Sequence, residues 1–278
     1  MSAWANIGGN AAQRVVIIMT TAAIDEVEVE RNGHVVHAII DRPERKNALT
    51  LAMYSALSRV LDDADRDGAI RAIVLSGAAG SFTSGNDLSD FLSNRDLAEG
   101  HPVLRFMRAL SDCRKPVVAA VSGPAIGIGT TLLLHCDLVY AGESARFQTP
   151  FASLGLCPEF ASSLLLPQRM GHARAAQMLL LGDAIDAQQA VACGLVNAVV
   201  PDATLVEHAV SVARRLAAQP PAAIRATKAL MREGQRAATM SIMQAEVRDF
   251  VVGLQSEEFK EAVNAFFEKR KPDFSRFE

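Results

Sequence analysis

Residues 117–141, VVAAVSGPAIGIGTTLLLHCDLVYA, decide the fold class of this chain. Short runs of apolar residues at Val117–Val121 and near residues 137–141 are typical of strands that are buried on both faces of a sheet. Between them, residues 126–135 have the length and apolar character of a helix that starts from a glycine-rich turn. A strand, a helix and a second strand in this order predict an α/β protein with a buried sheet.

The same alternation extends over the first two thirds of the chain. Further strands are predicted at residues 26–31, 35–40 and 72–75, with Asn32-Gly33 as the hairpin turn. Helices are predicted at residues 50–65, where Thr50 is the cap, and at 104–113. From Ser162 onward the pattern turns helical, with helices expected at residues 173–181, 186–193, 203–218, 222–233 and 257–269. We therefore expect an α/β core over residues 25–200, a helical region over residues 201–278, and a disordered leader over residues 1–24.

Composition narrows the classes of protein to which this chain can belong. Of its 278 residues, half are hydrophobic, which permits one large domain, and its net charge of -3 does not favour nucleic acid or an anionic membrane as a partner. The four cysteines form no CxxC pair, so neither a zinc site nor a disulfide framework is expected. We expect no metal, and free thiols in a reducing cytoplasm.

The first candidate functional segment is FTSGNDL, residues 82–88. Ser84 and Gly85 have little side chain, so a ligand can approach the backbone closely. An ordinary strand-to-helix turn capped by Asp87 is the alternative, and these residues taken alone favour it.

The second segment is the glycine-rich start of the helix predicted at residues 126–135. Backbone N–H groups at a helix start carry partial positive charge and suit an oxyanion, and Gly127 and Gly129 allow a sharp turn there. The spacing matches neither a P-loop nor a dinucleotide-binding motif. The alternative is a helix start whose glycines only permit close packing.

The third segment contains Glu159, the only acidic residue between Glu143 and Asp183. Its surroundings in the sequence are apolar, and burial would raise its pKa toward that of a useful general base. The alternative is a charge at a helix start after Pro158 that faces solvent.

Taken together, four motifs resemble the crotonase (enoyl-CoA hydratase/isomerase) family. They are DRPERKNAL at residues 41–49, FTSGNDL at 82–88, SGPAIGIGTTLLLHCDLVYA at 122–141 and FFEKRKPDF at 266–274. The resemblance covers about residues 27–274 and implies a ββα spiral core with a helical C-terminal region that makes contacts between subunits. It also implies an acyl-CoA substrate, no further cofactor, and a homotrimer or dimer of trimers. A cytoplasmic location is expected separately, because the C-terminal residues 275–278 are not a peroxisomal address.

The resemblance implies roles for individual residues. The backbone N–H groups of Asn86 and Ile128 would hold the thioester oxygen as it gains charge. Contacts with CoA or the acyl group are implied for Lys46, Asn47, Ala48, Ser84, Gly85, Asp87, Leu88, Gly127 and Phe151, and for Lys269, which in a neighbouring subunit could pair with phosphates.

The acidic residues separate the branches of the family. Typical hydratases hold a water between two glutamates, whose positions match Thr131 and Phe151 here. Glu159 instead matches the glutamate of the peroxisomal-type 3,2-enoyl-CoA isomerases. The resemblance therefore implies that Glu159 is the acid/base of a 3-enoyl-CoA to 2-enoyl-CoA isomerase. The alternatives are a 2-enoyl-CoA hydratase, another reaction of the family, and a non-catalytic acyl-CoA-binding homologue.

Overall fold

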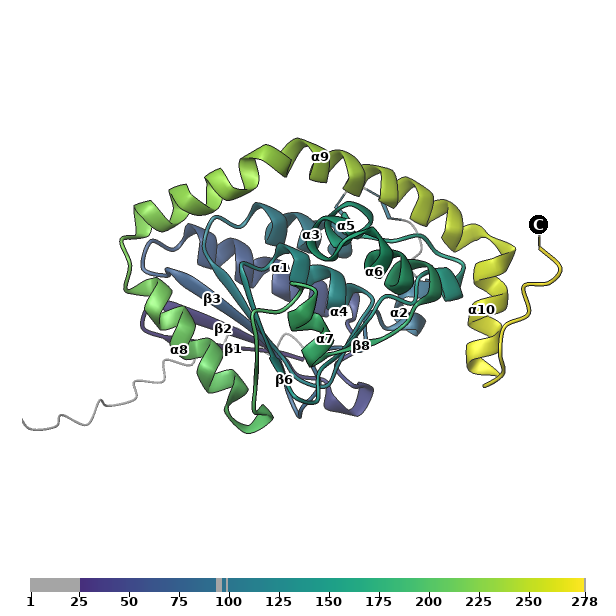
Figure 1. Ribbon diagram of the computed structural model, residues 1–278, viewed down its shortest axis with the longest axis horizontal. Helices are drawn as coiled ribbons and strands as arrows, with labels where there is room; N and C mark the ends of the chain where they lie inside the picture. The colour runs from purple at the N-terminus through teal and green to yellow at the C-terminus, as the bar shows by residue number, and fades with distance from the viewer. Residues whose placement is uncertain (1–25, 94–96, 99, 278) are drawn as a thin grey trace, which may run out of the picture.

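The protein is an α/β structure built on two sheets (Figure 1). The computed structural model describes residues 26–93, 97–98 and 100–277, so the predicted leader lies outside the described residues. The larger sheet has the strand order β1-β2-β3-β4-β6-β9, and the smaller one has the order β5-β7-β8. The strands are β1 (Val27–Asn32), β2 (Val35–Ile40), β3 (Ala72–Gly77), β4 (Val117–Val121), β5 (Pro124–Ile126), β6 (Leu138–Gly142), β7 (Arg146–Gln148), β8 (Ile185–Asp186) and β9 (Ala198–Val200).

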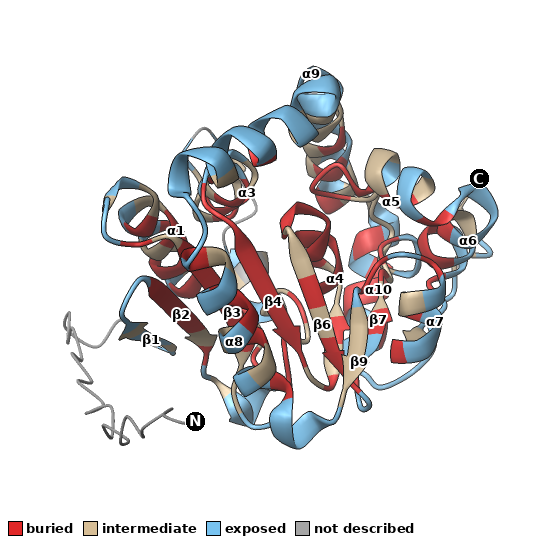
Figure 2. Ribbon diagram, turned by 60° about the vertical axis from the view of Figure 1, so that its left-hand side comes forward, coloured by how far each residue is buried: buried red, intermediate tan, exposed pale blue. Residues whose placement is uncertain are grey.

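The large sheet forms as the apolar runs predict. β1 and β2 are an antiparallel hairpin, and the remaining neighbours in this sheet are parallel. β3 and β4 are buried along their length (Figure 2), which is why they lack the alternation of a strand with one wet face. Ala72, Val74, Val118 and Ala120 pack on one side against α8, while the other side faces the main core.

Ten α-helices surround the sheets in the described part of the chain. They are α1 (Leu51–Arg66), α2 (Leu88–Ser93), α3 (Pro102–Asp112), α4 (Ile128–Thr131), α5 (Ser162–Met170), α6 (His172–Ala176), α7 (Ala187–Ala192), α8 (Leu205–Ala217), α9 (Pro221–Gln255) and α10 (Glu257–Phe267). Thr50 caps α1 as predicted, since its side chain accepts a hydrogen bond from the Met53 N–H at 3.2 Å. None of these helices is long and apolar enough to span a bilayer.

Two helix predictions were wrong in their extent. The helix predicted at residues 222–233 continues through Gly234 to Gln255 as α9. An exposed glycine inside a helix costs only about 1 kcal/mol relative to alanine, and the good helix formers on both sides outweigh it. The helix predicted at residues 126–135 begins only at Ile128, after strand β5, and tightens into a 3-10 helix at Leu132–His135.

The long helix α9 crosses the top of the molecule in Figure 1 and is fixed to the core near its start. The Lys228 ammonium donates to Asp137 Oδ2 and to the Lys115 carbonyl, both at 2.6 Å. Arg232 donates to the His135 carbonyl at 2.7 Å. The α/β core and helical C-terminal region predicted from the sequence are therefore confirmed and are joined by buried polar contacts.

Candidate active site

The loop that ends at Leu49 and the loop at residues 82–88 lie side by side, and the second of them presents the backbone N–H group of Asn86. The Leu49 N–H donates to the Gly85 carbonyl at 2.8 Å, and the Asp87 N–H donates to the Leu49 carbonyl at 2.9 Å. This parallel pairing leaves Asn86, between them, with its own N–H on the opposite edge. Thr83 pairs in the same way with Ala125, the central residue of β5, which brings the loop against the start of α4.

The second N–H group belongs to Ile128, the first residue of α4. A first helical residue has no acceptor within its own helix. Gly127 precedes it with φ 56° and ψ -117°, a conformation that L-residues rarely adopt, and this turn aims the Ile128 N–H outward from the helix. Across the described residues, neither this N–H nor that of Asn86 is hydrogen-bonded to a protein acceptor. Both predicted oxyanion donors therefore have no protein acceptor among the described residues.

Glu159 is buried, with only 6% of its surface exposed. One carboxyl oxygen, Oε1, has no hydrogen-bond partner among the described residues. Burial, followed by repulsion from Glu246, raises the pKa of Glu159 from 4.5 to about 8. The alternative interpretation, a solvent-facing charge at a helix start, is wrong, and the group has the proton affinity of a general base that works near neutral pH.

Tyr54 of α1 connects Glu159 with the oxyanion loop. Its buried hydroxyl donates a hydrogen bond to Asn86 Oδ1. Burial and then the negative charge of Glu159 raise the Tyr54 pKa well above 10. Tyr54 is therefore close enough to Glu159 to be affected by its charge. This contact could not be predicted from the sequence, because Tyr54 occupies an apolar position of an amphipathic helix, where a tyrosine is indistinguishable from a core residue.

The residue that follows Glu159, Phe160, belongs to a cluster of aromatic rings. The ring of Phe160 stacks on that of His135 at 3.8 Å and meets Phe106 edge-on at 6.4 Å, while Phe106 lies 5.4 Å from the Tyr54 ring. Burial lowers the pKa of His135 to about 3, so this imidazole is neutral. The chain directly after Glu159 is therefore held in a buried aromatic cluster that contains a neutral imidazole.

The comparison with known proteins identifies the family of the chain. The profile of the family described as Enoyl-CoA hydratase/isomerase matches residues 30–276. The chain belongs to this family. The crotonase resemblance inferred from the motifs is confirmed, and so is the fold that it implied.

Three relatives illustrate the breadth of the family. A 2,3-dehydroadipyl-CoA hydratase of Escherichia coli is 35% identical over 90% of this chain and 99% of its own length. Enoyl-CoA delta isomerase 2 of Rattus norvegicus is 37% identical over 88% of this chain and 63% of its own length. The solved structure of an enoyl-CoA hydratase/isomerase from Pseudoalteromonas atlantica is 44% identical, has a TM-score of 0.87 and matches 90% of this chain and 100% of that one.

The loops that the crotonase-family resemblance assigns to CoA lie together. The exposed Lys46 accepts a hydrogen bond at its carbonyl from the Ser84 N–H at 3.0 Å. Asn47 is fully buried, and its side-chain amide donates to the Ser81 and Ala78 carbonyls. The Asn47 side chain therefore shapes the loop, and Lys46 and the partly exposed Ala48 and Ser84 offer the surface to a ligand.

Asp87 has a structural part at this site. Its Oδ1 accepts hydrogen bonds from the backbone of Ser89 and Asp90, so it caps α2, which starts at Leu88. The alternative of a capped turn is thus confirmed for this residue. Its Oδ2 pairs with Arg42 at 2.7 Å, a contact that the sequence analysis missed because 45 residues separate the two.

The positions that match the two hydratase glutamates carry no acid. Phe151 is buried, and its ring lies 3.9 Å from where a side chain on Gly127 would begin. Thr131 is also buried, and its hydroxyl donates only to the Ile128 carbonyl, at 3.5 Å. Lys269 lies exposed just beyond α10.

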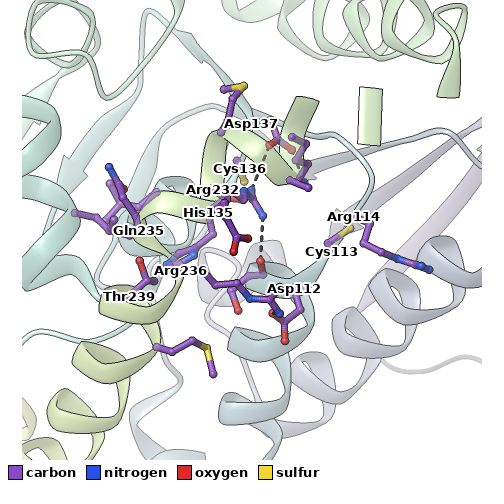
Figure 3. Close-up of a pocket in the computed structure, with 18 of the residues that line it drawn as sticks. Asp112, Cys113, Arg114, His135, Cys136, Asp137, Arg232, Gln235, Arg236 and Thr239 are labelled. Carbon is purple, nitrogen blue, oxygen red and sulfur yellow. Dashed lines mark hydrogen bonds and ion pairs between the residues drawn. The ribbon is translucent and has the colours of Figure 1, made fainter. Parts of the chain in front are cut away.

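A cavity of about 650 Å³ lies elsewhere, between α3, α5 and α9 (Figure 3). It is lined by Asp112, His135, Asp137, Arg232 and Arg236 among others, and by none of the predicted site residues. Some of its charged groups pair with one another, as Arg232 does with Asp137 and Arg236 with Asp112. The candidate for the catalytic group is instead Glu159, whose Oε1 has no hydrogen-bond partner among the described residues.

The buried carboxyl group has a consequence for stability. Below pH 4.5 Glu159 is protonated in both the folded and the unfolded chain, but between pH 4.5 and about 8 only the unfolded chain ionises. Stability is therefore lost as the pH rises, by an amount on the order of a few kcal/mol. Glu159→Gln should raise the thermal midpoint at pH 9 by several degrees and much less at pH 5, as measured by scanning calorimetry.

The exposed Glu233 on α9 provides the matched control for this measurement. Glu233→Gln changes the same chemical group without altering a buried charge and should leave both midpoints nearly unchanged. An equal shift at pH 5 and pH 9 for Glu159→Gln would contradict the assigned burial.

Proposed function

We propose that this protein converts 3-enoyl-CoA into 2-enoyl-CoA. The observation that carries the proposal is one buried carboxyl group, Glu159, at a site with two free N–H groups, while a phenyl ring and a hydroxyl occupy the hydratase positions. The similarity to an enoyl-CoA delta isomerase supports the same reaction.

The mechanism needs one mobile proton. The Glu159 carboxylate takes a proton from C2, and the electrons move into a dienolate whose oxygen accepts hydrogen bonds from the Asn86 and Ile128 N–H groups. Each such donor typically contributes roughly 3–4 kcal/mol to transition-state stabilisation. The protonated Glu159 then returns the proton at C4, which leaves the double bond at C2–C3. One acid/base suffices because both carbons lie along one face of the dienolate.

The direct test is turnover of a 3-enoyl-CoA, followed by the absorbance of the conjugated 2-enoyl thioester that forms. A parallel assay follows the loss of that absorbance when a 2-enoyl-CoA is hydrated. Hydration without isomerisation would refute the proposal and favour the hydratase alternative. The similarity to a 2,3-dehydroadipyl-CoA hydratase is the reason to test that alternative. Tight binding of CoA esters without turnover of either substrate would indicate a non-catalytic homologue.

The reaction should depend on pH through Glu159. The base must be ionised in the free enzyme, and its pKa lies at about 8. We expect kcat/KM to rise about tenfold for each pH unit up to that value and to level off above it. A profile measured from pH 6 to 9 checks this, and a flat profile would exclude Glu159 as the base.

Tyr54→Phe should weaken catalysis while the fold is kept. The change deletes the hydroxyl that donates to Asn86 Oδ1. Since a neutral hydrogen bond contributes about 0.5–1.5 kcal/mol, kcat should fall roughly two- to tenfold. Tyr140→Phe is the matched control, because Tyr140 belongs to the cluster under α8, on the other face of the sheet. Equal rates for the two variants would show that Asn86 needs no such support.

Assembly and CoA binding form a second part of the proposal. Large apolar side chains are exposed on α9 and α10, namely Leu230, Met231, Val252, Phe266 and Phe267, which supports self-association through residues 201–278. We propose a homotrimer or a pair of trimers, in which Lys46 and a neighbour's Lys269 approach the CoA phosphates. Sedimentation would show the assembly, and Lys269→Ala should raise KM without lowering kcat. No cofactor beyond the CoA thioester is proposed, and the proposed location is cytoplasmic.

A further inference from the structure

The turn that follows Glu159 has an unfavourable backbone conformation. Phe160 and Ala161 are consecutive non-glycine residues with left-handed φ angles of 58° and 56°. Each such residue costs about 1–2 kcal/mol, and this conformation persists only where the surroundings enforce it. The turn sets the direction in which the Glu159 side chain leaves the backbone, so whatever enforces the turn also orients the carboxyl group.

The enforcing group comes from α9. Glu246 Oε2 accepts a hydrogen bond from the Ala161 N–H at 2.5 Å, and Oε1 accepts from the Ser163 N–H at 3.0 Å and from the Ser163 hydroxyl at 2.6 Å. The Ala161 side chain cannot cap α5, so a carboxylate 83 to 85 residues further along the chain does so. An anion is favourable there because it meets the positive end of the helix.

Glu246 is itself buried, at 6% exposed. Burial raises the pKa of Glu246, the hydrogen bonds from Ser163 and Ala161 act in the opposite direction, and the ionised form of Glu246 raises the pKa of Glu159. The described salt bridges include neither carboxyl group, so no cation there neutralises the repulsion between them. The ionisable groups that interact with Glu159 are Glu246 of α9, Tyr54 of α1 and the Cys157 thiol. Further out, Arg169 of α5 acts on the neutral His135, and the exposed Asp249 of α9 acts on Cys157. Of these, Glu246 is the charge that acts on Glu159 most directly.

From this arrangement we infer that Glu246 is a positioning residue, which holds the turn 160–161 and keeps a negative charge behind the Glu159 carboxyl group. The inference deepens the proposed function and rests on it for its kinetic consequences. We do not propose that Glu246 contacts the substrate. It acts through Glu159. It also makes the helical C-terminal region part of the catalytic machinery, since α9 carries Glu246 and is anchored to the core by Lys228.

Three substitutions test the charge and the reach of Glu246. Glu246→Gln keeps the size and removes the charge, and it also loses at least one hydrogen bond, because the amide nitrogen cannot accept from the Ala161 or Ser163 donors. We expect kcat to fall by about tenfold and the acidic limb of the kcat/KM profile to move to lower pH by roughly one unit, because Glu159 then ionises more readily. Glu246→Asp keeps the charge but shortens its reach, so kcat should fall while the limb stays in place. Glu233→Gln makes the same chemical change on an exposed face of α9 and should behave as wild type.

The kinetic outcomes decide between positioning and mere capping. If Glu246→Gln loses thermal stability but the acidic limb of its kcat/KM profile does not move, Glu246 only caps α5 and the inference is overturned. Wild-type kinetics in this variant would also overturn it. If Glu246→Gln does not fold, Glu246→Asp and Ser163→Ala carry the test. Ser163→Ala removes one of the three donors, and unchanged kcat in both variants would likewise overturn the inference.

A second readout does not depend on turnover. In protein labelled with ¹³C-glutamate, the Glu159 carboxyl signal is identified by its loss in Glu159→Gln and is then titrated. In Glu246→Gln its pKa should be lower than in wild type, and an unchanged pKa would overturn the electrostatic part of the inference. Wild-type turnover by Glu159→Gln would refute the proposed function, whereas the titration would still measure the effect of Glu246 on Glu159.

Discussion

Replacing Glu159 with Gln is expected to lower kcat for a 3-enoyl-CoA by about 100- to 10,000-fold, the range typical of a deleted general acid/base. The amide is nearly isosteric, so the buried site keeps its shape, but it cannot take up the C2 proton. Binding of the CoA ester should change little, because the amide keeps the size of the side chain and the contacts with CoA are assigned to other residues. Steady-state kinetics together with a measured Kd for the CoA ester separate the two effects.

Glu143→Gln is the matched control, since Glu143 is the preceding acid in the sequence and is exposed. It should leave kcat within about twofold of wild type, as surface changes usually do. If Glu159→Gln were as active as this control, Glu159 would have no part in the mechanism. The isomerase proposal would then lose the observation on which it rests.

The second large effect is expected from Gly127→Ala, which attacks the oxyanion site through the backbone. A backbone N–H cannot be deleted by changing its own side chain, but it can be turned away. An alanine is strained at φ 56° and ψ -117°, so relaxation of the turn should misdirect the Ile128 N–H. We expect kcat to fall by about 100- to 1,000-fold, as for other lost oxyanion donors.

The added methyl group itself has room, because the nearest neighbouring atom, in the Phe151 ring, lies 3.9 Å away. The loss would therefore report on backbone direction and not on a clash. Gly33→Ala is the control: it also places alanine at a left-handed φ, 61°, in an open hairpin turn that is remote from the site. It should lower stability somewhat and keep activity. An active Gly127→Ala enzyme would exclude Ile128 as an oxyanion donor.

The local patterns of the sequence were sufficient for the fold class. Continuous apolar runs such as Val117–Val121 can only be satisfied by burial on both faces of a sheet, and the sheet has this form. Turn and cap chemistry worked for the same reason: Asn32-Gly33 and Thr50 act on residues within three positions of themselves. The prediction for α9 erred because a single glycine is a weak local signal that neighbouring helix formers outweigh.

For the candidate site, too, short motifs could be read from the sequence, whereas burial and contacts between distant residues could not. The motifs pointed to Asn86, Ile128 and Glu159, and the motif sequence alone was enough to place the chain in its family. Whether Glu159 was a base or a surface charge could not be read from its neighbours, since burial is a property of the assembled core. Tyr54 and Glu246 were invisible for the same reason: each acts on groups that are 32 to 85 residues away in the chain.

By itself, then, the sequence determined the α/β core and the family and pointed to the candidate site residues, because these depend on periodicity and on short contiguous motifs. Only the tertiary structure decided the proton affinity of Glu159 and the groups that orient it. Those properties arise when α1, α5 and α9 close around one carboxyl group, remove it from water and leave Glu246 as its nearest charge. Desolvation and charge repulsion depend on distance in space, which the order of residues along the chain does not record.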